Sequence, residues 1–395
     1  MKYSSLTQRV APGDDPSAPD PWAVHELALI REANGEDIVF LSIGQEADEV
    51  TPAVIVDAAI ESLQSGRHHY TQASGSDKLR NAVANYHKKL CGQTVGIDNC
   101  TVFAGAQNAL FSVAQVLLET GDEVLMLEPY YTTYSTTFAA TGAKIIEVPL
   151  TAANRYQLQV EQLLEAITNN TRLIVLNSPN NPMGQSYSME QYQGIIDACV
   201  QHNIWLLIDT VYADIVDPEL LSHPQTIPGA DKILITVGSL SKSHRMTGWR
   251  MGWAVAPSEL SDHLANLSVC MHYGLAPFIM DAAIVAIEQS TGTPTLVRDL
   301  LDKRRGVALK EMGDIAPAVI HDTGMGMFII VDVEPLKLTA LDFAMQLLEK
   351  HAVAVLPCVG FGPTGKYLVR IGLCVDDDKL ATACKKIQDF VKTLT

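Results

Sequence analysis

The chain has 395 residues, of which 47% are hydrophobic and 18% charged, so it can bury a large core and has the length of two or three domains. Its net charge of −17 argues against binding to nucleic acid or to an anionic membrane surface, because both need clustered Lys and Arg side chains. The seven cysteines are odd in number and include no CxxC pair, so we expect neither a disulfide framework nor a metal site.

The first 37 residues are predicted to form an N-terminal arm that belongs with the smaller of two domains. The arm has no apolar segment typical of a secretory signal, and no apolar run is long enough to span a bilayer, so we expect a cytoplasmic protein. The proline-rich stretch 11–22 indicates irregular backbone. An apolar run predicts a strand at 38–43, and helical spacing predicts helices at 52–64 and 75–90.

Residues 38–290 are predicted to form a large α/β domain built on a mostly parallel seven-stranded sheet. Short apolar runs that alternate with helical patterns are typical of a parallel sheet covered on both faces. The runs span 100–105, 123–127, 144–148, 172–177, 204–209, 233–239 and 251–256. The last two lie close together, so they could include an antiparallel strand. Residues 291–395, with a charged amphipathic helix followed by mixed strand and helix patterns, predict a smaller α+β domain.

Polar residues stand at the carboxyl ends of several predicted strands, which is where open α/β sheets bind ligands. Their chemistry matches the needs of pyridoxal 5′-phosphate (PLP). Its aldehyde forms a Schiff base with a lysine, for which Lys242 is the candidate, and its ring nitrogen stays protonated beside a buried carboxylate, here Asp209. Asn181 and Tyr212 can donate to its phenolic oxygen. Lys242, Asp209 and Tyr212 are therefore the catalytic candidates.

The phosphate of this cofactor is a dianion, which suits a helix N-terminus with free backbone N–H groups. The predicted phosphate ligands are Gly105, Ala106 and Gln107 at the start of a helix, together with Ser239, Ser241 and Arg250 around the lysine loop. Each feature alone is a common turn or loop. Their joint occurrence in order, each at a strand end, indicates a cofactor site.

These motifs resemble the fold-type I PLP-dependent aminotransferases over essentially the whole chain. The matching segments are YTQASGSDKLR from Tyr70, GAQNAL, EPYYTTY, NSPNNPMG, DTVY, SLSKSHRMTGWRMGW and YLVRIGL. The resemblance implies that Tyr131 stacks on the cofactor ring and that Tyr70 reaches the phosphate of the partner subunit in a homodimer. It also implies that Arg370 pairs with the substrate α-carboxylate, helped by Asn181 and by the backbone near Gly44. A charge inside an apolar strand costs desolvation unless it is paired, which agrees with a ligand carboxylate at Arg370.

The opening MKYSSLTQRV, the lysine loop and NLSVCMHYGLAPFIMDAA are most similar to arginine–pyruvate transaminases. An arginine substrate needs acids to hold its guanidinium group. The candidate acids are Glu46, Asp48 and Glu49, which follow the strand at 38–43, with Asp214 and Asp322 as further candidates. Each could equally belong to a solvated rim. N-terminal arms of such enzymes often fold over the active site, so His25 is a further candidate for a functional role.

Two departures from the ordinary family pattern, Gln45-Glu46-Ala47 after Gly44 and Thr210 after Asp209, resemble the PLP-dependent arginine oxidases and hydroxylases of natural-product pathways. We therefore expect an L-arginine oxidase. Such an enzyme passes electrons from a quinonoid intermediate to dioxygen and releases a dehydrogenated 2-ketoarginine, ammonia and hydrogen peroxide. The alternative is an L-arginine–pyruvate aminotransferase, and a remote alternative is a PLP-binding regulatory module.

Overall fold

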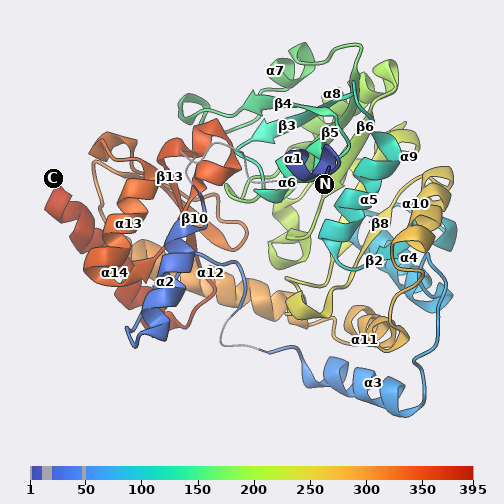
Figure 1. Cartoon of the computed structure of the whole chain (residues 1–395), viewed down its shortest axis with the longest axis horizontal. Helices are drawn as coiled ribbons and strands as arrows, with labels where there is room; N and C mark the ends of the chain where they lie inside the picture. The colour runs from blue at the N-terminus through green and yellow to red at the C-terminus, as the bar shows by residue number, and fades with distance from the viewer. Residues whose placement is uncertain (1, 11–19, 47–49, 395) are drawn as a thin grey trace.

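The computed structural model describes residues 2–10, 20–46 and 50–394. Its large sheet has seven strands (Figure 1). Their order is β2-β8-β7-β6-β5-β3-β4, and β8 runs antiparallel to both neighbours while the others are parallel. The strands are β2 (Cys100–Phe103), β3 (Glu123–Glu128), β4 (Lys144–Pro149), β5 (Thr171–Asn177), β6 (Trp205–Asp209), β7 (Leu234–Ser239) and β8 (Gly252–Val255). The predicted mostly parallel sheet is confirmed, with its antiparallel strand in the last pair.

Alternate residues of each central strand point to opposite faces of the sheet, and both faces are buried. Leu206 and Ile208 of β6 pack against one layer of helices, whereas Leu207 packs against the other. The first layer contains α7 (Val160–Glu165), α8 (Met189–His202) and α9 (Ala230–Ile233), and the second contains α5 (Ala106–Leu117), α6 (Thr133–Ala139) and α10 (Ser258–Met271). A third group packs near β2 and β8 and consists of α3 (Ala53–Gln64), α4 (Asp77–Cys91) and α11 (Pro277–Glu288).

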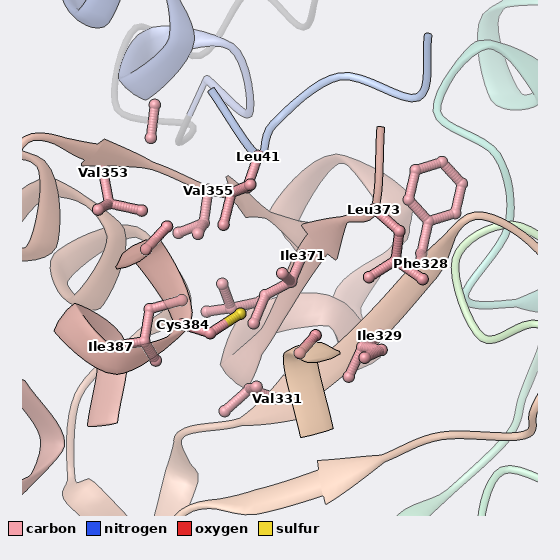
Figure 2. Packing of buried hydrophobic residues seen from close by; sticks show 14 of the residues in the cluster. Leu41, Phe328, Ile329, Val331, Val353, Val355, Ile371, Leu373, Cys384 and Ile387 are labelled. Carbon is pink, nitrogen blue, oxygen red and sulfur yellow. The ribbon is translucent and has the colours of Figure 1, made fainter. Parts of the chain in front are cut away.

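The smaller domain is built on an antiparallel sheet in the order β12-β13-β10-β9. Its elements are α12 (Thr293–Met312), β9 (Val319–His321), β10 (Phe328–Asp332), α13 (Ala340–His351), β11 (Val353–Ala354), β12 (Leu356–Pro357), β13 (Leu368–Gly372) and α14 (Asp377–Leu394). Figure 2 shows its apolar core, in which Ile371 of β13 and Val331 of β10 lie near Ile387 of α14. The predicted α+β architecture matches this sheet with helices packed on it.

Two N-terminal elements belong to this smaller core. Helix α2 (Ala23–Ala33) buries Val24 and Ala28 in it, and β1 (Val39–Phe40) pairs in parallel with β11. Strand β1 falls just inside the range predicted for the large domain, which begins at residue 38, although it pairs with a strand of the smaller domain. The predicted domain ranges remain predictions. The short helix α1 (Leu6–Arg9) instead lies beside the large domain, where Arg9 donates to the Ala140 carbonyl at 3.1 Å (Figure 1).

Within the described ranges, no helix combines the length and the apolar character needed to cross a membrane. The same residues contain no group of three or more His, Cys, Asp or Glu side chains placed to hold a metal ion.

Candidate active site

A cavity of about 400 Å³ lies where the carboxyl ends of the large-sheet strands face the smaller domain. Its walls come from residues that are far apart in the sequence. Of the residues predicted from the sequence, it is lined by Gly44, Ala106, Gln107, Tyr131, Asn181, Asp209, Tyr212, Ser239, Ser241, Lys242, Arg250 and Arg370. The structure therefore brings most of the predicted site into one place, and Gly105 lies directly against Arg250 at its edge.

Asp209 ends strand β6 and sits opposite Asn177 of β5 in the sheet register. Its carboxylate is buried and accepts hydrogen bonds from the Tyr134 hydroxyl at 2.6 Å and the Val211 amide at 3.1 Å. Burial raises the pKa of Asp209 to about 6, although the two hydrogen bonds and the nearby Lys242 act in the opposite direction. A buried carboxylate of this kind is suited to a cationic partner. The sequence predicted no role for Tyr134, although this residue ends EPYYTTY, one of the segments that resemble the aminotransferases.

The Lys242 amine donates to the Gly44 carbonyl at 2.7 Å. Burial lowers its pKa, so the neutral amine is populated more readily than that of an exposed lysine. The loop that carries Lys242 is fixed from within, because the Ser239 hydroxyl bonds both to the Ser241 hydroxyl and to the Met251 carbonyl, each at 2.9 Å. The serines thus shape the loop around the amine.

The N-terminus of α5 and Arg250 form a cradle that has no room for larger residues. Gly105 has a φ of +85°, and a Cβ at this position would lie 2.4 Å from the Arg250 Nη2 atom. A Cβ on Gly252 would lie 2.6 Å from the Ala106 amide nitrogen. The Gln107 side chain is occupied by two threonines, and the Gly105 amide donates to the Phe103 carbonyl at 2.7 Å. The amides of Ala106 and Gln107, in the first turn of α5, are the backbone donors left for a ligand. Backbone N–H groups and a guanidinium group around a tight space fit a phosphate dianion.

Arg370 in β13 is buried and links both domains. It donates to the Asn181 side-chain oxygen at 3.0 Å and to the Ser42 carbonyl at 2.8 Å, and its guanidinium carbon lies 4.0 Å from the centre of the Phe328 ring. Its Nε has no hydrogen-bond partner, and among the described residues no carboxylate lies within ion-pair distance of it. Burial lowers the pKa of this guanidinium. An unpaired buried cation is a receptor for an anion.

The Asn181 amide also donates to the Tyr212 hydroxyl at 3.2 Å, so the predicted donors form one network with Arg370. Tyr131 lines the cavity with its ring edge-to-face against Tyr134, with centroids 5.6 Å apart. This arrangement provides an aromatic wall, a requirement for stacking on a pyridine ring.

His25 and Tyr70, which were predicted from the sequence, lie outside the cavity. The His25 Nδ1 is 2.9 Å from the Ser42 hydroxyl, and partial burial lowers its pKa, but Trp22 rather than His25 lines the cavity. Tyr70 is 87% exposed and packs edge-to-face on Tyr273, with centroids 5.1 Å apart. A role for Tyr70 in cofactor binding therefore requires a second chain.

The acids predicted to hold the substrate side chain are mostly engaged elsewhere. The Glu46 carboxylate accepts two hydrogen bonds from Arg304, at 2.9 and 3.1 Å, and both side chains are only 4% exposed. Contrary to the prediction, this carboxylate is held by the protein instead of being presented to a ligand. Asp322 pairs with Arg305, and Asp214 accepts from a tyrosine hydroxyl at 2.6 Å beside a different cavity. Asp48 and Glu49 lie outside the described residues.

A second cavity, of about 590 Å³, adjoins the first, and both are lined by Gln45, Ser241, Lys242 and Thr247. It contains one acid that sequence reasoning missed, Asp57 on α3. The only available signal was its position in a helix that follows the Gly44 loop, and such a signal does not distinguish Asp57 from other helical acids.

Comparison with known proteins places these features in context. The family model for aminotransferase class I and II matches residues 36–387. The arginine–pyruvate transaminase AruH of Pseudomonas aeruginosa is 41% identical over 390 residues, which cover 98% of this chain and 97% of that protein. An aspartate aminotransferase of Pyrococcus horikoshii is 32% identical and covers 91% of this chain and 92% of its own length. The solved aspartate aminotransferase of Thermus thermophilus superposes with a TM-score of 0.90 at 27% identity, over 98% of this chain and 99% of that one.

Proposed function

Because the chain belongs to the aminotransferase class I and II family, whose members depend on PLP, we propose that it transfers the amino group of L-arginine to pyruvate. The family membership rests on a match to almost the whole chain. The choice of substrates is supported by the 41% identity to a relative that is named for these two compounds. The predicted assignment to fold-type I PLP enzymes is confirmed by the same comparisons.

The expected arginine oxidase activity is wrong. The relative that shares 41% identity is a transaminase, and other relatives are aspartate aminotransferases. Thr210 is one of the two departures behind that expectation. Its hydroxyl donates to the carbonyl of Val237 in strand β7 at 2.9 Å, so this residue has a structural role in the sheet. Dioxygen was expected as a partner only because an oxidase was expected, so that expectation is withdrawn as well.

The observation that supports an aminotransferase best is the joint placement of an amine, a buried acid and an unpaired buried guanidinium around one cavity. These are Lys242, Asp209 and Arg370. An α-amino acid presents an amine and a carboxylate on one carbon, so a site that transforms it needs a fixed cation for the carboxylate and a base near the α-carbon. The cavity contains both.

The residues of the site fit PLP. Asp209 would hold the proton on the ring nitrogen, Asn181 and Tyr212 would donate to the phenolic oxygen, and the cradle formed by the α5 N-terminus and Arg250 would hold the phosphate. When bound, PLP supplies an aldehyde and an electron-accepting ring. Tyr134 keeps the Asp209 carboxylate oriented through its 2.6 Å hydrogen bond.

Lys242 is the residue that moves protons. Because burial lowers its pKa, its amine can accept the proton from the substrate α-carbon and return it during the same turnover. Arg370 orients the substrate by pairing its two terminal nitrogens with the α-carboxylate, which limits rotation about the α-carbon. Phe328 and Phe361 flank the guanidinium and keep the pair in an apolar environment, where the interaction is stronger than in water.

We further propose that the enzyme is a homodimer in which Tyr70 serves the neighbouring site. Tyr70 and Tyr273 are 87% and 58% exposed, and α3, which lies at the edge of the molecule in Figure 1, exposes Val54, Ile60 and Leu63. Exposed apolar and aromatic side chains such as these are enriched at protein interfaces. Light scattering of the purified protein should give twice the chain mass of 42.9 kDa, and a monomer would contradict the proposal.

The function is tested with the PLP-loaded enzyme, arginine and pyruvate. We expect stoichiometric formation of alanine and 2-ketoarginine, measured by mass spectrometry, and loss of this activity in Lys242→Ala. Aspartate with 2-oxoglutarate is the control pair, chosen because several relatives are aspartate aminotransferases. Transfer from aspartate with none from arginine would refute the proposed substrate and leave the aminotransferase class intact.

A further inference from the structure

We propose that the second cavity is the subsite for the substrate side chain and that Asp57 is the acid that binds the guanidinium group. This inference rests on the proposed arginine–pyruvate activity. The cavity has a volume of about 590 Å³, within the range of roughly 300–1,000 Å³ that is usual for small-molecule sites. It opens beside Lys242, the residue that must also lie next to the substrate α-carbon.

The substrate would occupy both cavities, with its α-carboxylate in the first and its side chain in the second. Arg370 lines only the first cavity, where it can hold the α-carboxylate, whereas Lys242 and Gln45 line both. A substrate whose α-carbon lies at Lys242 can therefore extend its side chain past Gln45 into the second cavity. The walls there include Val56 and Met327, which suit the methylene groups of a long side chain.

Two of the acids in the described part of the chain line this cavity, Glu46 and Asp57. Glu46 is already paired with Arg304 in a buried arrangement, so binding a second guanidinium would require breaking that pair. The Asp57 side chain is exposed, and among the described residues no cation lies within ion-pair distance of its carboxylate. Of these two acids, Asp57 is thus the one whose carboxylate is available to a cationic ligand.

The wall around Asp57 is fixed before any substrate binds. The Thr51 hydroxyl donates to the Arg245 carbonyl at 2.7 Å and accepts from the Trp249 indole nitrogen at 3.0 Å. These bonds join the segment that precedes α3 to the lysine loop. Since Asp57 is on the second turn of α3, its position relative to Lys242 is set by this junction. A preorganised acid loses less conformational freedom on binding, which favours selection by charge.

The test compares arginine with citrulline, which has the same length but carries a neutral urea group. With pyruvate as acceptor, Asp57→Asn should lower kcat/KM for arginine by about ten- to a hundredfold, as expected for loss of a hydrogen-bonded charge pair. The value for citrulline should change by less than about threefold, so the preference for arginine shrinks. Asp57→Glu should restore part of the preference. Glu61→Gln is the matched control, because Glu61 lies one turn further along α3, is exposed and does not line the cavity.

A second measurement does not depend on turnover. Titration of arginine into the PLP-loaded enzyme without keto acid changes the visible absorption of the cofactor, and the midpoint gives an apparent affinity. This affinity should weaken by a similar factor in Asp57→Asn and stay unchanged in Glu61→Gln. If the wild-type enzyme uses arginine and Asp57→Asn keeps both its affinity and its preference over citrulline, the subsite is refuted while the function stands.

Arg245 lines the same cavity and carries the opposite charge to Asp57, so it defines a result that would overturn the proposal. A wild-type enzyme that prefers aspartate to arginine, and loses this preference in Arg245→Gln, would show that the cavity selects an acidic side chain. That result would overturn the role of Asp57 together with the proposed arginine specificity.

Discussion

The buried ion pair between Glu46 and Arg304 is expected to stabilise the fold strongly only as a pair. Each side chain is 4% exposed, and Arg304 also donates to the Leu373 carbonyl at 3.3 Å. Among the described residues Arg304 also contacts Asp377, which is 31% exposed and lies 3.4 Å from the Arg304 Nε, too peripheral to replace Glu46. Removing one partner leaves an uncompensated buried charge, which costs about 3–5 kcal/mol, whereas replacing both by apolar residues of similar volume is often close to neutral.

The perturbation is a double-mutant cycle with Glu46→Met, Arg304→Met and the double variant, measured by urea unfolding of the PLP-loaded protein. Each single variant should lose about 3–5 kcal/mol of unfolding free energy, and the double variant should lose much less than the sum of the two. The more exposed pair of Arg172 and Asp122, whose side chains are 49% and 14% exposed, is the control, and its cycle should show a coupling of about 1 kcal/mol or less. Additive losses at Glu46 and Arg304 would refute the reasoning.

Three further predictions concern the first cavity. Burial raises the pKa of Asp209 from 3.8 to about 6, so the folded state is favoured fully below pH 3.8, where Asp209 is protonated, and this advantage is lost as the pH rises through about 6. Without cofactor, Asp209→Asn should therefore have a higher free energy of unfolding than the wild type at pH 8, by up to about 3 kcal/mol. Thermal unfolding should show no such difference at pH 4. Arg370→Lys keeps the charge but loses the planar fork, so steady-state kinetics should show KM for both amino and keto acid raised about tenfold or more, with a smaller change in kcat. Gly105→Ala would displace the Arg250 guanidinium, so a titration should show weaker PLP binding, and unchanged affinity would contradict the cradle.

Much of the fold could be predicted because it follows from local patterns. A β-branched apolar run such as 172–177 must be buried on both faces, and its alternation with helical segments leaves a parallel sheet as the natural arrangement. The carboxyl ends of such strands meet at one edge, so Asp209 and Lys242 were expected to lie together, and they line the same cavity. Strand β1 was assigned to the large domain because a short apolar run does not reveal its partner, which is β11 more than 300 residues later.

The sequence by itself determined the class of fold and the cofactor, because both depend on short motifs whose chemistry can be read residue by residue, and the same motifs predict the residues that would hold the cofactor. Only the tertiary structure decided which acids are available to a substrate. Glu46, Asp57 and Asp322 carry the same charge in the sequence, but Glu46 and Asp322 are neutralised by Arg304 and Arg305 of α12, while Asp57 faces a cavity. The physical reason is that the interaction free energy of a carboxylate depends on its distance to cations and on burial, both of which are set by elements distant in the chain.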